Sequence, residues 1–173
     1  MNSQALFNRL AGFPSRLSAM VTGVSDEDVR WKPSSGAWSI VEIVRHLEDE
    51  EAEDFSVRVR MTLEDPSQPW PSIDPEAAAI ERKYNEADLS KSLRRFIDLR
   101  QDSLQWLEPR LVEIAEKANQ AYVHPKLGPT MLGEVFAGWV AHDQLHLRQI
   151  TKRLFQMTER DAGSFSTRYA GTW

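Results

Sequence analysis

Apolar residues recur at intervals of three and four positions along most of this chain. Because each residue of an α-helix advances by roughly 100°, this spacing places them on one face of a helix. We find no convincing run that alternates apolar and polar residues, as half-buried strands would. The pattern predicts an all-α protein, a four-helix bundle that buries these faces against one another. The four apolar stripes are Leu6, Leu10, Phe13, Leu17 and Val24; Ile40, Ile43, Val44, Leu47, Phe55 and Met61; Leu93, Phe96, Ile97, Leu104 and Leu107; and Leu132, Val135, Trp139, Ile150, Leu154 and Met157.

Prolines and caps divide the first half of the chain. Pro14 falls within the first stripe and should kink that helix or mark a restart, because proline lacks a backbone donor. Ser39 and Glu42 form a potential capping box for the second helix, which we expect to end near Leu63. The segment 65–71 holds three prolines, so we predict a crossover loop that could also serve as a lid.

The second half of the chain is predicted to hold an interrupted helix and one long helix. The third helix should begin as a piece over 75–85, continue in a run capped by Ser90, and extend briefly after Pro109. The segment 124–129 has the composition of a loop, and Thr130 can cap the last helix.

Length and charge limit the classes of protein. A chain of 173 residues can bury one core, so we expect one bundle over 1–160 and a polar tail over 161–173. The formal charge of −5 and the scattered basic residues argue against nucleic-acid binding. No stretch approaches 18 uncharged apolar residues, and the N-terminus does not resemble a signal peptide. We therefore expect a cytoplasmic protein that acts on a small molecule, without nucleic-acid or membrane partners.

The chain contains no cysteine. This excludes a disulfide framework, a zinc–thiolate site and a thiol nucleophile. A bound metal would therefore have nitrogen and oxygen ligands. The histidines that could supply nitrogen are His46, His124, His142 and His146.

His142 and His146 form the most informative pair. They are separated by about 40° around a helix and by roughly 6 Å along it, so their side chains point the same way. Both occupy the apolar stripe of the last helix, between Trp139 and Ile150. Two neighbouring imidazoles in a core need partners, which a shared metal ion or separate hydrogen bonds could provide. For the pair alone these two interpretations are equally good.

His46 shifts the balance toward a metal. It lies at the flank of the apolar stripe of the second helix and can supply a third imidazole from a facing helix. Three protein ligands with an open position are typical of catalytic metal sites. On its own, His46 would more often be a surface residue near the start of a helix. The spacing thus predicts a metal site made of His46, His142 and His146.

Several residues near these histidines have two interpretations. Glu50 lies one turn beyond His46 and could be a general base or a ligand, but in the acidic run 48–51 it could equally be a solvated charge. Asp143 points about 100° away from His142, which favours a supporting contact or a solvated charge. Gln149 could hydrogen-bond an imidazole or be a buried structural amide.

The remaining candidates are expected to have structural roles. His124 lies in a loop with proline and glycine, where it would cap the loop rather than bind metal. Trp38 and Trp139 are interpreted as packing residues that could form a pocket wall.

Two motifs resemble those of a known family, the DinB-like superfamily. The first is Trp31-Lys32-Pro33 followed by Gly36-Ala37-Trp38-Ser39-Ile40-Val41-Glu42-Ile43-Val44-Arg45-His46-Leu47. The second is the segment 124–130, His-Pro-Lys-Leu-Gly-Pro-Thr, followed by 139–150, Trp-Val-Ala-His-Asp-Gln-Leu-His-Leu-Arg-Gln-Ile. The resemblance covers about residues 5 to 158.

The resemblance implies an up-down-down-up four-helix bundle with a long crossover, often as a homodimer. It also implies a divalent transition metal such as nickel, zinc or iron at His46, His142 and His146. The family includes proposed metal-dependent hydrolases of the YfiT type, bacillithiol transferases and mycothiol-dependent maleylpyruvate isomerases. The fold and the metal follow from this resemblance more directly than the reaction does.

Four functions remain open from the sequence. The leading hypothesis is a metal-dependent enzyme of the thiol-transferase or detoxification type, with a low-molecular-weight thiol as a possible cosubstrate. A metal-dependent hydrolase that activates a water on the metal, with Glu50 as base, is the first alternative. The second is a dimeric, stress-related helical protein with a structural metal. The last is a metal-free bundle with buried histidines.

Overall fold

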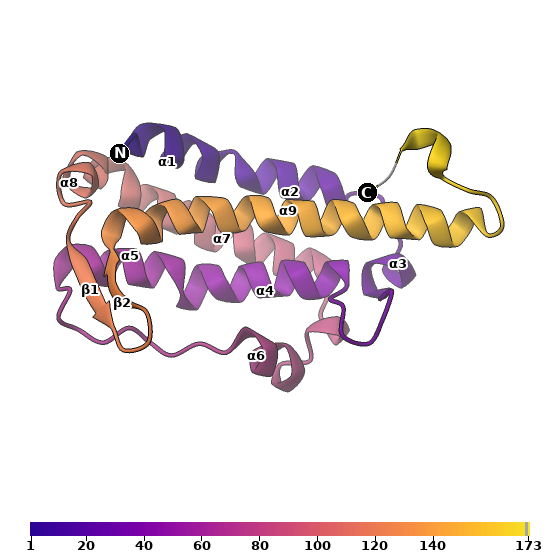
Figure 1. Ribbon diagram of the computed structural model, residues 1–173, viewed down its shortest axis with the longest axis horizontal. Coiled ribbons are helices and arrows are strands. Elements are labelled where there is room, and N and C mark those ends of the chain that lie inside the picture. The colour runs from indigo at the N-terminus through magenta and orange to yellow at the C-terminus, as the bar shows by residue number, and fades with distance from the viewer. Residues whose placement is uncertain (172) are drawn as a thin grey trace.

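Four long helical segments lie side by side in the computed structural model, which describes residues 1–171 and 173 (Figure 1). The first segment runs in one direction, the second and third return in parallel, and the fourth runs with the first. The predicted all-α four-helix bundle is confirmed. The helices are α1 (Ser3–Ala11), α2 (Phe13–Val21), α3 (Asp26–Arg30), α4 (Ile40–Glu53), α5 (Phe55–Glu64), α6 (Pro75–Glu81), η1 (Tyr84–Glu86), α7 (Leu89–Leu107), η2 (Glu108–Arg110), α8 (Leu111–Glu116), α9 (Leu132–Ala162) and η3 (Arg168–Ala170).

The first segment breaks where the proline pattern predicts a restart. α1 ends at Ala11, Gly12 joins the two helices, and Pro14 lies in the first turn of α2. Proline is tolerated there because a backbone N–H in the first turn has no intrahelical acceptor. Leu10 and Leu17 stay buried on either side of the break, so both helices contribute to one apolar face.

The second segment begins at the predicted capping box. Ser39 Oγ accepts a hydrogen bond from the Glu42 backbone N–H at 3.3 Å, and Glu42 Oε2 accepts one from the Ser39 N–H at 2.7 Å. These bonds satisfy two of the donors that a helix N-terminus leaves free. An interruption at Asp54, with φ −118° and ψ −95°, separates α4 from α5 and was not predicted. α5 ends at Glu64, next to the expected end at Leu63.

The crossover and the third segment follow the predicted order with a different cap. The chain from Asp65 crosses the outside of the bundle to α6 (Figure 1). α7 begins after Asp88, whose side chain accepts a hydrogen bond from the Lys91 N–H at 3.0 Å. The predicted cap at Ser90 is therefore wrong, because Ser90 already lies inside the helix. The extension after Pro109 is the short helix α8.

A small hairpin precedes the last helix. Strands β1 (Ala121–His124) and β2 (Gly128–Met131) pair antiparallel, with Gly128 at φ 77° beside the turn. The loop predicted over 124–129 is thus the turn and parts of both strands. Thr130 lies in β2 and does not cap α9; the cap is Met131, whose N–H donates to Glu134 Oε2 at 2.8 Å. Strands of four residues are too short to show a periodic pattern.

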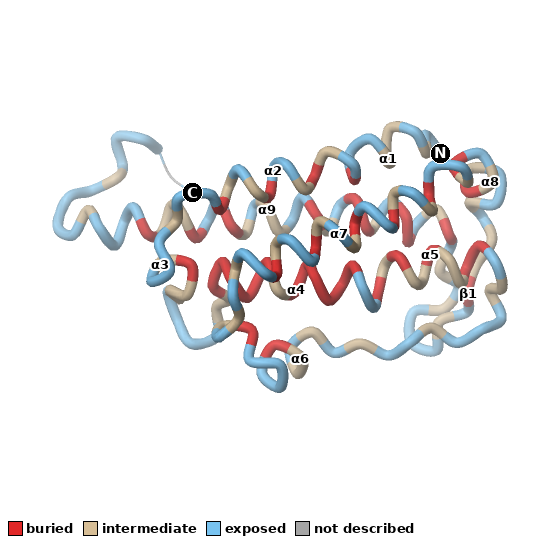
Figure 2. Tube along the Cα trace, turned by 180° about the vertical axis from the view of Figure 1, so that it is seen from behind, coloured by how far each residue is buried: buried red, intermediate tan, exposed pale blue. Residues whose placement is uncertain are grey.

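A buried ionic cluster joins the two apolar clusters of the core. Arg100 of α7 is 1% exposed, and its guanidinium lies over the rings of Phe96 in one cluster and Trp139 in the other. Its nitrogens contact both oxygens of Asp143, at 2.7 and 3.0 Å, and Glu51 Oε2 at 2.9 Å. This Arg100 cluster connects α4, α7 and α9, and Figure 2 shows how continuous the burial of α4 is.

In the described part of the chain, no helix has both the length and the apolar character needed to cross a membrane. The division into a bundle and a tail, and the predicted homodimer, stay predictions.

Candidate metal centre

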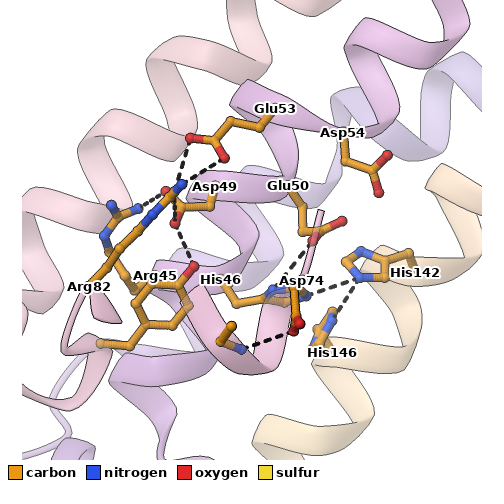
Figure 3. A network of polar contacts seen from close by, with 12 residues as sticks. Arg45, His46, Asp49, Glu50, Glu53, Asp54, Asp74, Arg82, His142 and His146 are labelled. Atoms are coloured by element: carbon orange, nitrogen blue, oxygen red, sulfur yellow. Dashed lines mark hydrogen bonds and ion pairs between the residues drawn. The ribbon is translucent and has the colours of Figure 1, made fainter. Parts of the chain in front are cut away.

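Three histidines from two facing helices converge on one point (Figure 3). His142 and His146 project from successive turns of α9, and their Nε2 atoms are 3.0 Å apart. His46 comes from α4, and its Nε2 lies 3.2 Å from the Nε2 of His142. The structure therefore brings together the three residues that the sequence selected, which are called the histidine triad below.

The triad lies at the edge of the core, between aromatic walls. His46 is 4% exposed, whereas His142 and His146 are more accessible. The ring of Trp38 packs edge-on against His46, with 4.8 Å between centroids, and the ring of Phe55 lies 4.9 Å from that of His142. Trp38 thus forms part of the wall, while Trp139 is packed in the core at 2% exposure. Both were expected to be packing residues.

Burial keeps the triad neutral. Burial first, and the neighbouring imidazoles second, lower the pKa of His46 to about 3 and the pKa of His142 to about 2. The pKa of His146 is lowered in the same way, with Gln149 opposing the shift. Neutral imidazole is the form that binds a metal ion, so no proton has to be displaced at neutral pH.

A hydrogen bond determines which nitrogen His146 turns toward the triad. The Nδ1 of His146 lies 2.9 Å from Gln149 Oε1, so it carries the proton that this contact requires. Its Nε2 then carries no proton, and the lone pair of this atom faces the Nε2 of His142. The Nδ1 of His46 lies 3.7 Å from Glu50 Oε1, which is too long for a hydrogen bond. Gln149 thus orients an imidazole, one of its two expected roles.

The donor set fits a divalent transition metal. Imidazole nitrogens bind zinc at about 2.0–2.1 Å, and two of them on one ion are roughly 3.0–3.4 Å apart at angles of 90–110°. The observed separations of 3.0 and 3.2 Å match this spacing. The Nε2 of His142 faces two other Nε2 atoms, yet a neutral ring has at most one proton there. A cation would satisfy the lone pairs that hydrogen bonds leave unmatched.

The acidic run 48–51 is buried, so the solvated interpretation of this run was wrong. Three of its four carboxylates pair with basic residues from later parts of the chain. Glu48 lies 3.1 Å from Arg95, Asp49 lies 2.6 Å from Arg82, and Glu51 lies 2.9 Å from Arg100. The acidic residues 48–51 therefore indicate ion pairs between distant segments of the folded chain rather than a solvent-exposed helix face.

Glu50 is the exception within this run, because it faces the triad. It is 8% exposed, and no lysine or arginine nitrogen of the described residues lies within 4 Å of it. Burial, together with the adjacent carboxyl group of Asp54, raises the pKa of Glu50 to about 9. Asp54 itself is paired with Arg58. A cation in the triad would supply the positive charge that Glu50 lacks.

The other residues considered in the sequence have structural contacts. The Nδ1 of His124 accepts hydrogen bonds from the N–H groups of Lys126 and Leu127, both at 3.1 Å, so His124 caps its loop as expected. Asp143 is buried against Arg100, which confirms a contact between helices and excludes a solvated charge.

Arg100 was missed by the sequence analysis. It lies three residues after Ile97 and four before Leu104, within the apolar stripe of α7. A charged residue in such a position signals a buried ion pair, and Asp143 occupies the equivalent position four residues after Trp139. The same reasoning that selected the histidines would have found both residues.

A cavity of about 550 Å³ opens onto the triad. Its walls include Trp38, Glu50 and Arg153, with Pro75 and Glu76 from the start of α6. The segment 65–71 does not line it, and Trp70 packs instead on the hairpin, with its ring 4.4 Å from that of Tyr122. The lid expected from this loop is therefore wrong. A second cavity, of about 710 Å³, continues along α9 from the triad.

The fold and the triad define a helical-bundle protein with a site that fits a divalent metal ion. The chain belongs to the DinB superfamily, whose family model matches residues 9–150. This agrees with the resemblance found in its two motifs.

Two known proteins are similar to the chain. The first is an Oceanobacillus iheyensis protein named "Putative metal-dependent hydrolase OB0413", 28% identical over 139 residues, which cover 80% of this chain and 77% of that protein. The second is the solved structure of YfiT from Bacillus subtilis, described as "a probable metal-dependent hydrolase with an unusual four-helix bundle topology". It matches with a TM-score of 0.79 and 20% identity, over 90% of this chain and 87% of that one. The YfiT match supports the four-helix bundle fold.

Proposed function

We propose that this protein is a metal-dependent hydrolase with its active centre at the histidine triad. The observation that carries the proposal is the convergence of three neutral Nε2 atoms, 3.0 and 3.2 Å apart, at the wall of an open cavity. His46, His142 and His146 would hold the ion. When bound, a divalent ion supplies Lewis acidity, which lowers the pKa of a water and polarises a carbonyl or phosphoryl oxygen.

Glu50 is the proposed general base. Two observations support this role: Glu50 lines the cavity at the triad, and no lysine or arginine nitrogen of the described residues lies within 4 Å of it. With its pKa raised to about 9 the carboxyl group would be protonated at neutral pH, and the charge of an ion in the triad would lower that pKa so that Glu50 could accept a proton. The ion pair of Asp54 with Arg58 holds the neighbouring carboxylate in place. Trp38 and Phe55 limit access of bulk water to the imidazoles, which strengthens electrostatic interactions within the site.

The proposal is tested by ester hydrolysis with matched variants. Zinc-loaded and nickel-loaded protein would be assayed against a panel of nitrophenyl esters, beside His142→Ala and Glu50→Gln. We expect His142→Ala to lose both metal and activity. Glu50→Gln should keep the metal and lose about 100-fold or more in kcat, the range for a general base. Full activity in Glu50→Gln, or no ester cleaved by any metal form, would contradict the proposal.

Thiol transfer is a second candidate, which the size of the site favours. The cavities of about 550 and 710 Å³ share four residues and provide more room than one small substrate needs. A thiol cosubstrate could occupy the second cavity, and the chain has no cysteine of its own. Consumption of a thiol with a chlorodinitrobenzene electrophile, dependent on His142, would support this candidate. Hydrolysis without any thiol would favour the first.

A further inference from the structure

We propose that Arg153 is a binding site for the carboxylate of the substrate, so that the protein acts on anionic molecules. This inference rests on the proposed function, because it concerns the substrate of the same site. Arg153 lies on α9 and lines both of the cavities that meet at the triad.

The guanidinium of Arg153 is held in a fixed orientation. The residue is 7% exposed, although a guanidinium seldom becomes so buried without a carboxylate. Its Nε donates to the backbone oxygen of Trp38 at 2.6 Å, and its Nη1 donates to Gln156 Oε1 at 2.5 Å. Both contacts are to neutral oxygens, so the positive charge is oriented but is not neutralised by them.

The carboxylates around Arg153 are engaged elsewhere. None in the described part of the chain lies within 4 Å of it. Glu42 is close enough to oppose the lowering of the Arg153 pKa. However, Glu42 pairs with Lys32 at 2.9 Å and closes the capping box of α4. Burial lowers the pKa of Arg153 from its usual high value, and a bound anion would restore the stabilisation that burial removes.

The remaining donors of Arg153 suit a carboxylate. A guanidinium has five N–H groups in a planar fork, and the two contacts above engage only Nε and one N–H of Nη1. The edge formed by Nη1 and Nη2 can still bind both oxygens of a carboxylate. In the described structure Nη2 has no hydrogen-bond acceptor.

The position on α9 sets the distance between this anion site and the triad. Arg153 is seven residues beyond His146, which corresponds to about 20° around the helix and about 10 Å along it. Both side chains therefore face the same cavity and are two helical turns apart. Glu50, Asp54 and Glu76 line the same cavity as Arg153, so it holds acidic side chains as well as a basic one. The separation along α9 would place a carboxylate bound at Arg153 several bonds away from the bond that reacts at the triad.

The test compares binding of glutarate and butyrate, which have similar chains but differ in one carboxylate. Isothermal titration of the zinc-loaded protein at low salt should show glutarate binding at least about 10-fold more tightly than butyrate, as expected for a charge-assisted pair. Arg153→Gln should abolish this preference without changing the zinc content. Arg94→Gln, which removes an exposed positive charge from α7, should leave the preference unchanged.

Equal affinities in the wild type, or a preference that survives in Arg153→Gln, would overturn the inference. If Arg153→Gln does not fold, Arg153→Lys is decisive, because it keeps the charge and loses the planar fork. A preference of several-fold should remain with lysine, whereas no preference at all would assign Arg153 to holding the Trp38 loop. Binding needs no turnover, so a failed ester assay would count against the hydrolase alone.

Discussion

Neutral, buried imidazoles are the feature of the site that most affects its response to pH. In the unfolded chain a histidine takes up a proton near pH 6.5, whereas the folded, metal-free protein holds the pKa of His46 at about 3 and that of His142 at about 2. Between these values the unfolded state binds more protons. Acidification below pH 6.5 therefore favours unfolding through these residues.

The variant His142→Gln removes the contribution of His142 to this pH dependence. In urea unfolding with a chelator present, the stability of wild type should fall more steeply than that of the variant as the pH drops from 6.5 to 4.5. The difference in slope is about 1.4 kcal/mol per pH unit. Glu50, with its raised pKa, acts in the opposite direction, but it is present in both proteins. Parallel pH profiles would show that His142 is protonated in the folded state.

Arg100 is expected to contribute to stability rather than to chemistry. Arg100→Met would leave Glu51 and Asp143 buried without a cation, which costs about 3–5 kcal/mol. Arg95→Met is the control on the same helix, because Arg95 is largely exposed and its pair with Glu48 contributes about 1 kcal/mol at most. Urea unfolding at pH 7 measures both. Equal losses would contradict a special role for the buried cluster.

Polar residues at core positions of an apolar stripe could be identified from the sequence, but the residues that they contact could not. His142 and His146 stood out because they occupy core positions of one helix, and that observation needs only helical geometry. The partners of Glu48, Asp49 and Glu51 come from later parts of the chain. Their burial depends on how the helices are placed, which local spacing does not specify.

At the scale of elements, the caps decide where helices begin. Ser39 and Glu42 were identified because a capping box is a local pattern. Asp88 and Ser90 are both good caps by composition, and the structure uses Asp88. η1 (Tyr84–Glu86) ends two residues before Asp88, and composition alone does not distinguish the two caps.

Matched alanine variants test this assignment. Asp88→Ala should lower the melting temperature by about 2–4 °C, because the Lys91 N–H loses its acceptor. Ser90→Ala should leave the melting temperature nearly unchanged, since Ser90 is exposed within the first turn. Thermal unfolding followed by circular dichroism distinguishes them. The reverse order of effects would restore the cap predicted from the sequence.

The β-hairpin and the break at Asp54 mark the limit of the element predictions. β1 and β2 pair over four residues each, so their apolar pattern is too short to compete with loop composition. Asp54 lies inside an otherwise continuous apolar stripe. Its backbone departs from helical values, and Phe55 begins a new helix whose ring lies against His142.

At the scale of the molecule, the site joins helices that are distant in sequence. His46 and His142 are 96 residues apart, and the crossover and the third segment lie between α4 and α9 in the sequence. The order of four helices was predictable from periodicity and proline. The cavity at the triad was not, because it depends on the 36–38 loop and α6.

A metal ion should stabilise the folded protein. Zinc at 100 times its dissociation constant adds about 2.7 kcal/mol through binding to the folded state alone. The melting temperature should rise by about 5–10 °C in wild type and stay unchanged in His46→Ala. Differential scanning calorimetry with and without zinc measures this effect. A similar rise in His46→Ala would place the ion elsewhere.

Elemental mass spectrometry on untagged protein tests most directly whether one ion binds to the histidine triad. Wild type and the control His124→Ala, which changes a histidine outside the site, should carry about one equivalent of metal. His46→Ala, His142→Ala and His146→Ala should each lose it while keeping their helical content. Metal that is substoichiometric in wild type, or that survives all three substitutions, would contradict the account.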